Sequence, residues 1–124
     1  MATVRPMARI ERMAAGFPVR DLEAAFAHYR RLGFTTRAYE GGDYGFLTRD
    51  GIELHVGVVE QVDSSGAKHT AYLFVDDADA MAAEWVAAGV EVNRPVDTPW
   101  GQHEGAVVDP DGNVLRFGSP IAEG

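Results

Sequence analysis

The chain carries one eight-residue pattern twice: DGIELHVG at residues 50–57 and DGNVLRFG at residues 111–118. Aspartate, glycine, leucine and a final glycine occupy matching positions in the two copies. Further upstream, Val19 and Asp21 recur as Val75 and Asp77, with a spacing shorter by five residues. The difference falls at residues 95–101, where a loop is expected. A duplicated unit of about fifty residues is typical of folds built from two structural repeats.

Each half of the chain has the pattern of a strand, a helix and three short strands. Asp21 and Asp77 are suited to begin the helices, because an aspartate side chain accepts hydrogen bonds from free backbone amides at a helix N-terminus. Gly33 and Gly89 are suited to end them. The expected strands of the first half are residues 9–19, 34–39, 44–49 and 52–58. Those of the second half are residues 69–75, 90–94, 102–108 and 114–118.

The pattern predicts an α+β fold in which two βαβββ modules form one cup-shaped, eight-stranded mixed sheet. The repeats are expected at residues 9–59 and 67–119, with a polar linker at residues 60–66. Neither half could bury its sheet alone, so residues 1–124 are predicted to form a single domain. Four large aromatic residues are predicted to lie in the core: Phe26, Tyr29, Phe34 and Trp85.

Composition excludes several classes of function. The 124 residues include no cysteine, which rules out disulfides and thiolate chemistry. Nineteen acidic residues against eleven Lys and Arg give a formal net charge of −8, which disfavours nucleic acids and anionic membranes as partners. The same charge is compatible with a cationic ligand. No apolar run approaches the roughly 20 residues that span a bilayer. Residues 1–12 do not resemble a signal peptide, so a cytoplasmic location is expected.

Four strings resemble the vicinal oxygen chelate superfamily, which includes glyoxalases, dioxygenases and bleomycin-resistance proteins. They are Phe17-Pro18-Val19-Arg20-Asp21-Leu22, Tyr29-Arg30-Arg31-Leu32-Gly33-Phe34, Pro99-Trp100-Gly101 and Asp109-Pro110-Asp111-Gly112-Asn113. The resemblance covers residues 12–118 and is closest to the bleomycin-resistance proteins. It implies a cup-shaped sheet and a homodimer that holds ligands in clefts at the subunit interface. Pro18 and its small neighbours suit a first strand whose N-terminal arm is exchanged between subunits.

Metal enzymes of this superfamily take ligands from four symmetric positions, which the resemblance places at Ala14, His55, Thr70 and Arg116. Alanine has no donor atom, threonine is a poor ligand and arginine is a permanent cation. His69 would reach the site only if its strand slipped by one residue, which would reverse the faces of that strand. The prediction is therefore no metal and no cofactor. A Glu53/His55 pair is the remaining argument for a metal.

Without a metal, the cup is expected to offer an aromatic and polar lining for a small aromatic ligand. Either Tyr44 or Phe46 should face it, depending on the pleat of the strand, and Phe46 is chosen here. Trp100 follows Pro99 in the loop that interrupts the repeat, where a role in the core is less natural than a ligand wall. The candidate ligand-binding residues are Phe46, Glu53, His55, Tyr72, Phe74, Trp100, His103 and Arg116.

Three functions fit these residues. The first is non-catalytic sequestration of a bleomycin-like or other aromatic antibiotic, which would confer resistance. The second is a divalent-metal lyase, isomerase or dioxygenase of the same superfamily, and the third is a small-metabolite sensor. No nucleophile triad, phosphate loop or dinucleotide motif is present, which favours binding over catalysis. Arg116 is expected to replace the charge of the metal and to pair with Glu53 or with the ligand.

Overall fold

A computed structural model describes residues 7–63 and 68–121 as two βαβββ modules. The first module contains β1 (Ala15–Val19), α1 (Leu22–Arg31), β2 (Thr35–Ala38), β3 (Tyr44–Arg49) and β4 (Ile52–Val58). The second contains β5 (Thr70–Phe74), α2 (Ala78–Ala87), β6 (Asn93–Asp97), β7 (Gln102–Val108) and β8 (Val114–Pro120). Of the linker predicted at residues 60–66, residues 64–66 lie outside the described part of the chain, as does residue 67.

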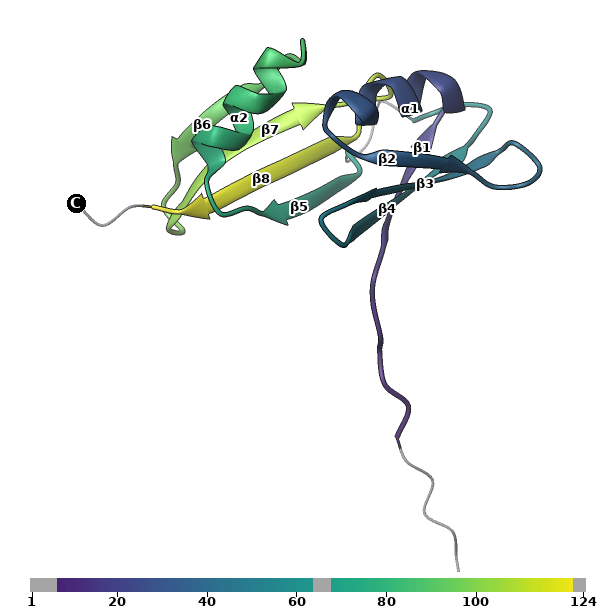
Figure 1. The fold of residues 1–124 in the computed structure, drawn as a ribbon, viewed down its shortest axis with the longest axis horizontal. Coiled ribbons are helices and arrows are strands. Elements are labelled where there is room, and N and C mark those ends of the chain that lie inside the picture. Colours follow the sequence, from purple (N-terminus) through teal and green to yellow (C-terminus); the bar gives the residue numbers. More distant parts are fainter. Residues whose placement is uncertain (1–6, 64–67, 122–124) are drawn as a thin grey trace, which may run out of the picture.

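Each module has its own four-stranded mixed sheet, and the two sheets have the same order. The first is β1-β4-β3-β2 and the second is β5-β8-β7-β6. In both, the first strand runs parallel to the last and the other pairs are antiparallel. Both helices lie on the same side of the sheets (Figure 1). The α+β prediction with two βαβββ modules is thus confirmed, but the eight strands form two sheets rather than one continuous sheet.

The helix and turn signals of the sequence are confirmed. Asp21 accepts a hydrogen bond from the amide of Ala24, and Asp77 accepts one from the amide of Ala80. Gly33 and Gly89 follow the helices with φ of 87° and 86°, a left-handed conformation that glycine adopts without strain. β3, β4 and β7 have the predicted bounds.

β1 and β6 differ most from the predicted bounds, and β2, β5 and β8 differ by one or two residues at their ends. β1 begins at Ala15 rather than residue 9. In the register of β1 with β4, where Ala15 lies opposite Leu54, residues 7–12 would lie beyond Ile52, the first residue of β4. β6 begins at Asn93 rather than residue 90. The amide of Val90 instead bonds the carbonyl of Trp85, so Val90 belongs to the closing turn of α2 and is buried there.

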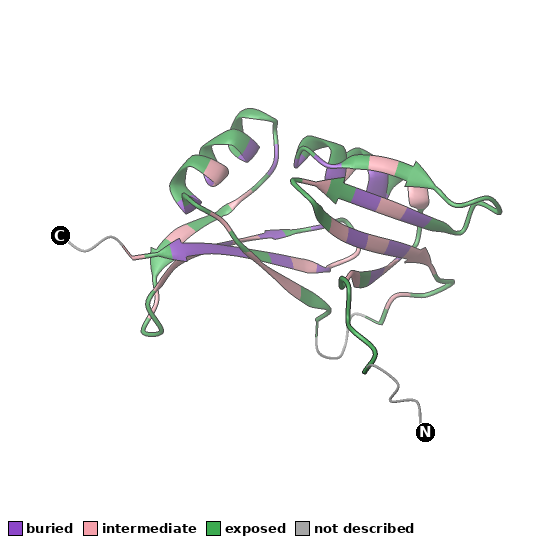
Figure 2. Ribbon diagram, turned by 60° about the horizontal axis from the view of Figure 1, so that its bottom comes forward, coloured by how far each residue is buried: buried purple, intermediate pink, exposed green. Residues whose placement is uncertain are grey.

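The core lies between the helices and the facing sides of the two sheets. Along β1, β3, β4 and β7, buried residues alternate with less buried ones, as expected when one face of a sheet is covered (Figure 2). Phe26, Tyr29, Phe34 and Trp85 are all buried, as predicted, and they belong to one cluster drawn from both modules. The two modules therefore share a core although they share no strand pair.

The loop of residues 109–113 is the main polar joint between the modules. Asp109 is 5% exposed, and its Oδ2 accepts hydrogen bonds from the hydroxyl of Tyr29 and the amide side chain of Asn113, both at 2.8 Å. Its Oδ1 accepts the backbone amides of Asp111 and Asn113. Asn113 in turn donates to the carbonyl of Pro18 in the first module. Burial, and then the charge of Asp109, raise the pKa of Tyr29.

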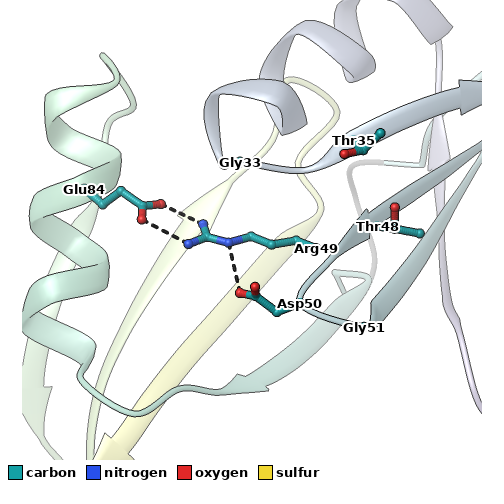
Figure 3. A pocket seen from close by; sticks show the side chains of 7 residues that line it. All are labelled: Gly33, Thr35, Thr48, Arg49, Asp50, Gly51 and Glu84. Atoms are coloured by element: carbon teal, nitrogen blue, oxygen red, sulfur yellow. Dashed lines mark hydrogen bonds and ion pairs between the residues drawn. The ribbon is translucent and has the colours of Figure 1, made fainter.

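A second joint connects β3 to α2, beside a shallow pocket of about 530 Å³ (Figure 3). The guanidinium of Arg49 donates to both carboxylate oxygens of Glu84, at 2.6 and 3.0 Å, and to the carbonyl of Leu32 at 2.7 Å. The indole of Trp85 donates to the same carbonyl. Because Arg49 is already engaged on all sides, we interpret this pocket as part of the joint rather than as a binding site.

Candidate ligand-binding face

The side of the sheets opposite the helices carries the candidate ligand-binding residues other than His103, and we call it the open face. Strand alternation decides which residues belong to it. On β8, Leu115 and Phe117 are buried under the helices, so Arg116 and Gly118 point to the open face. Residues in register with them share this face, including Tyr72 and Phe74 of β5. By the same alternation, Glu53 and His55 of β4 belong to the open face of the first module.

Three rings form the centre of the open face in the first module. Tyr44, Phe46 and His55 contact one another edge to face, with ring centroids 5.0 to 5.6 Å apart. Tyr44 and Phe46 are two residues apart on β3, so their side chains point to the same side and both belong to the open face. The guanidinium of Arg37 lies 4.2 Å from the centroid of Phe46, in a cation–π contact.

A chain of polar contacts runs through this cluster. The hydroxyl of Tyr44 lies 2.8 Å from Nδ1 of His55, and Nε2 of His55 lies 2.6 Å from the carboxylate of Glu53. Glu53 also forms an ion pair with Arg12 of the N-terminal segment. The hydrogen bond from His55, together with the charge of Arg12, lowers the pKa of Glu53. Of the two partners expected for Arg116, Glu53 is instead paired with Arg12, whereas pairing of Arg116 with the ligand stays a prediction.

In the second module, aromatic and polar side chains surround Gly118. The rings of Tyr72 and Phe74 have centroids 4.8 Å apart, and the indole of Trp100 donates to Glu104 at 3.2 Å. A side chain at position 118 would overlap the hydroxyl of Tyr72, so glycine provides the space in which that ring lies. Phe74 is 82% exposed and Trp100 is 62% exposed. Large exposed aromatic surfaces of this kind are suited to stack a ligand.

Two polar atoms beside Gly118 are buried yet lack a hydrogen-bond partner among the described residues: the hydroxyl of Tyr72 and Oε1 of Gln102. Burial, and then the nearby Glu104 carboxylate, raise the pKa of Tyr72, which keeps its hydroxyl protonated as a donor. Gln102 and Glu104 were not among the residues expected from the sequence. The signal for them is the burial of Gly105 and Val107, which places residues 102 and 104 on the opposite, open side of β7.

His103 does not belong to the open face. It shares the side of β7 that carries Gly105 and Val107, and its ring contacts Asp79 of α2 and Asp97 of β6, each at 2.8 Å. The expectation that His103 lines the ligand site is corrected on this ground, because a strand residue cannot face both sides.

The two aspartates make His103 a source of pH-dependent stability. Hydrogen bonds to Asp79 and then to Asp97 raise the pKa of His103. A group whose pKa is raised by folding stabilises the folded state below its unfolded pKa, and this contribution is lost as the pH rises through the folded pKa. The wild-type protein should thus lose stability relative to His103→Gln as the pH rises from about 6 to 8. Urea unfolding of both proteins across that range measures the difference, and parallel curves would contradict the expectation.

The chemistry of the four symmetric positions does not fit a divalent metal. Only His55 offers a good donor, whereas Ala14, Thr70 and Arg116 offer none, a weak one and a positive charge. Over residues 7–63 and 68–121, no group of three or more His, Asp or Glu side chains is placed to hold a metal ion. Glu53 is engaged with His55 and Arg12.

An apolar groove of about 820 Å³ separates the exposed end of β4 from β5 and α2. Leu73, Met81 and Trp85 line it, together with Glu53, Tyr72 and Phe74 of the open face. The N-terminal segment contributes Arg12 and Met13. The groove therefore connects the candidate ligand residues of the two modules.

The fold and the open face together define a class: paired βαβββ modules with a candidate ligand face on which the described residues offer no group of side chains placed to hold a metal. Residues 9–117 match the family model described as Glyoxalase/Bleomycin resistance protein/Dioxygenase superfamily. The chain belongs to this superfamily.

Three similar proteins are described as bleomycin resistance or bleomycin-binding proteins. A bleomycin resistance protein of Klebsiella pneumoniae is 27% identical over 108 residues, covering 81% of this chain and 85% of the relative. The crystal structure of the bleomycin resistance determinant encoded on transposon Tn5 superposes with a TM-score of 0.81 at 23% identity, covering 91% of this chain and all of that one. The bleomycin-binding protein of Streptomyces verticillus, solved with copper(II)-bleomycin, gives a TM-score of 0.76 at 25% identity, with coverage of 93% and 100%.

Proposed function

We propose that this protein binds and sequesters a bleomycin-like or other aromatic antibiotic and so confers resistance, without transforming the drug. The observation that carries the proposal is the open face itself, where exposed aromatic rings surround polar groups and the described residues offer no group of side chains placed to hold a metal. The bleomycin resistance protein of Klebsiella pneumoniae and the bleomycin-bound protein of Streptomyces verticillus support the choice of ligand class.

Titration with bleomycin tests this function directly. Trp100 is exposed and should report binding through its fluorescence, whereas Trp85 is fully buried and should contribute a constant background. Because the chain carries a net charge of −8, affinity for a cationic drug should fall as salt rises from about 20 to 500 mM. Unchanged fluorescence with bleomycin, with other aromatic antibiotics of the same charge also inert, would reject the proposal.

The binding unit is proposed to be a homodimer in which the N-terminal arm reaches a second copy. Residues 7–11 extend away from the body beyond Arg12 (Figure 1), and Met7 and Ile10 are 92% and 94% exposed. β5 lies at the end of its sheet, so one of its edges has no strand partner in the described chain. The apolar groove runs beside that edge. An extended apolar arm from another subunit would cover both.

Sedimentation should give about twice the chain mass of 13.4 kDa at micromolar concentration. A Met7→Ser/Ile10→Ser double variant removes the apolar contacts of the arm and should dissociate at concentrations at least tenfold higher than the wild type. Arg9→Ala, on the same exposed segment, is the matched control and should remain dimeric. A monomeric wild-type protein would contradict the arm exchange.

A metal-dependent lyase, isomerase or dioxygenase is the alternative, and the donor set of the open face does not favour it. Metal analysis of protein purified without chelators separates the two, since stoichiometric metal bound through His55 would reject a binding-only role. No helix among the described residues is long and apolar enough to cross a membrane. We place the protein in the cytoplasm as part of the proposal, where it would meet an imported drug.

A further inference from the structure

We propose that Tyr44 selects a neutral N–H donor on the ligand, because Glu53 and His55 fix its hydroxyl as a hydrogen-bond acceptor. The inference deepens the proposed function and rests on it, in that the open face is taken to be the ligand site. It adds a specificity-determining residue and states the chemical group that this residue recognises.

The direction of hydrogen bonding is set at Glu53. An ionised carboxylate can only accept hydrogen bonds. Glu53 contacts Nε2 of His55 at 2.6 Å and the guanidinium of Arg12, and both contacts favour its ionised form, in agreement with its lowered pKa. Nε2 of His55 must therefore carry the proton and donate it to Glu53.

The tautomer of His55 in turn sets the direction of its hydrogen bond with Tyr44. A neutral imidazole has one donor and one acceptor nitrogen, so with Nε2 protonated its Nδ1 is the acceptor. The hydroxyl of Tyr44 lies 2.8 Å from that Nδ1 and must donate to it. Because the hydroxyl proton of Tyr44 is donated to His55, only the lone pairs of the hydroxyl oxygen remain to interact with a ligand. Tyr44 is 37% exposed, so the ligand can reach it but has to supply the donor.

The charges around this oxygen distinguish a neutral donor from an ammonium group. Arg37 lies over the ring of Phe46, which contacts both Tyr44 and His55. Arg12 compensates the charge of Glu53 at the other end of the chain of contacts. A ligand ammonium would be a third cation beside the guanidinium groups of Arg12 and Arg37, whereas Glu53 is the carboxylate in this chain of contacts. A carboxamide-type N–H is therefore favoured over an ammonium.

The first test determines the tautomer of His55, and therefore the direction of its hydrogen bonds to Glu53 and Tyr44, in the absence of any drug. Nitrogen NMR of the full-length protein, labelled with ¹⁵N-histidine and held at pH 8, should show His55 protonated at Nε2 and unprotonated at Nδ1. A His55 protonated at Nδ1 would donate to Tyr44 and leave the phenol free to act as a donor, which overturns the inference.

The second test uses two matched probes, benzamide and N,N-dimethylbenzamide, which share the ring and carbonyl but differ in the N–H donor. One hydrogen bond corresponds to an affinity difference of about fivefold in favour of benzamide. Tyr44→Phe should abolish that difference while retaining the ring. Tyr39→Phe, which alters an exposed tyrosine of the same module that contacts Phe46, is the control and should preserve it.

A wild-type protein that binds both amides equally, or binds neither, overturns the inference, as does an unchanged difference in Tyr44→Phe. The outcome is separable from that of the proposed function. The protein could show the Nε2–H tautomer and the Tyr44-dependent preference for benzamide but fail to bind bleomycin or other aromatic antibiotics. That result would support the role of Tyr44 and reject the proposed antibiotic ligand.

Discussion

Asp109→Ala should lower the free energy of unfolding by roughly 3–5 kcal/mol, the largest loss we expect from any single polar substitution. Four hydrogen bonds end on this buried carboxyl group. Truncation leaves the hydroxyl of Tyr29, the side chain of Asn113 and two backbone amides without their acceptor inside the protein. For a domain of this size the melting temperature should fall by roughly 10–20 °C, which calorimetry can measure.

The matched control for Asp109 is Asp43→Ala, because Asp43 lies in an exposed turn of the first module. Its stability should stay within about 0.5 kcal/mol of the wild type. Tyr29→Phe removes one of the four hydrogen bonds and should fall between the two variants, at about 1 kcal/mol. An Asp109→Ala protein as stable as the Asp43→Ala control would show that the hydrogen bonds of Asp109 contribute little to holding the modules together.

Trp100→Ala should weaken binding of an aromatic antibiotic by roughly 30- to 150-fold, while the melting temperature hardly changes. The indole is 62% exposed and follows Pro99, whose fixed φ limits the freedom of the loop. A ring that is already held in place loses little entropy when a ligand stacks on it. The lost apolar area and the lost stacking together amount to roughly 2–3 kcal/mol.

Trp100→Phe is the control for that variant, since it keeps an aromatic ring and should retain most of the affinity. Fluorescence is lost with the indole, so calorimetric titration with bleomycin is the appropriate measurement. A large fall in melting temperature with unchanged affinity would assign Trp100 to packing or to the dimer contact. The ligand wall would then have to be sought at Tyr72, Phe74 and Phe46.

The fold was largely predictable because its signals are local. The duplicated aspartate–glycine pattern, the helix caps at Asp21 and Asp77 and the glycines after each helix specify the modules without reference to distant contacts. The joint at Asp109 could not be foreseen in this way. The sequence identifies residues 109–112 as a turn, but the hydrogen bond from Tyr29 joins residues that are 80 positions apart.

The part of the candidate site that lies on strands with clear alternation of apolar and polar residues was predictable from the sequence. This alternation places Glu53, His55, Tyr72, Phe74 and Arg116 correctly on the open face. His103 was chosen for its chemistry and its position near a loop. Residues 105–108, Gly-Ala-Val-Val, are all small or apolar, so only the burial of Gly105 and Val107 in the structure shows that His103 lies on the other side of the strand. The partner of Glu53 was missed because Arg12 lies 41 residues away, in a segment without regular structure.

The separation of the eight strands into two sheets has a consequence for how the protein could be divided. No backbone ladder crosses from one module to the other in the described chain, so a cut between residues 60 and 63 would interrupt no strand. Each fragment would expose its half of the common core and depend on the other to cover it. We therefore expect either fragment to fold only when its complementary fragment is present.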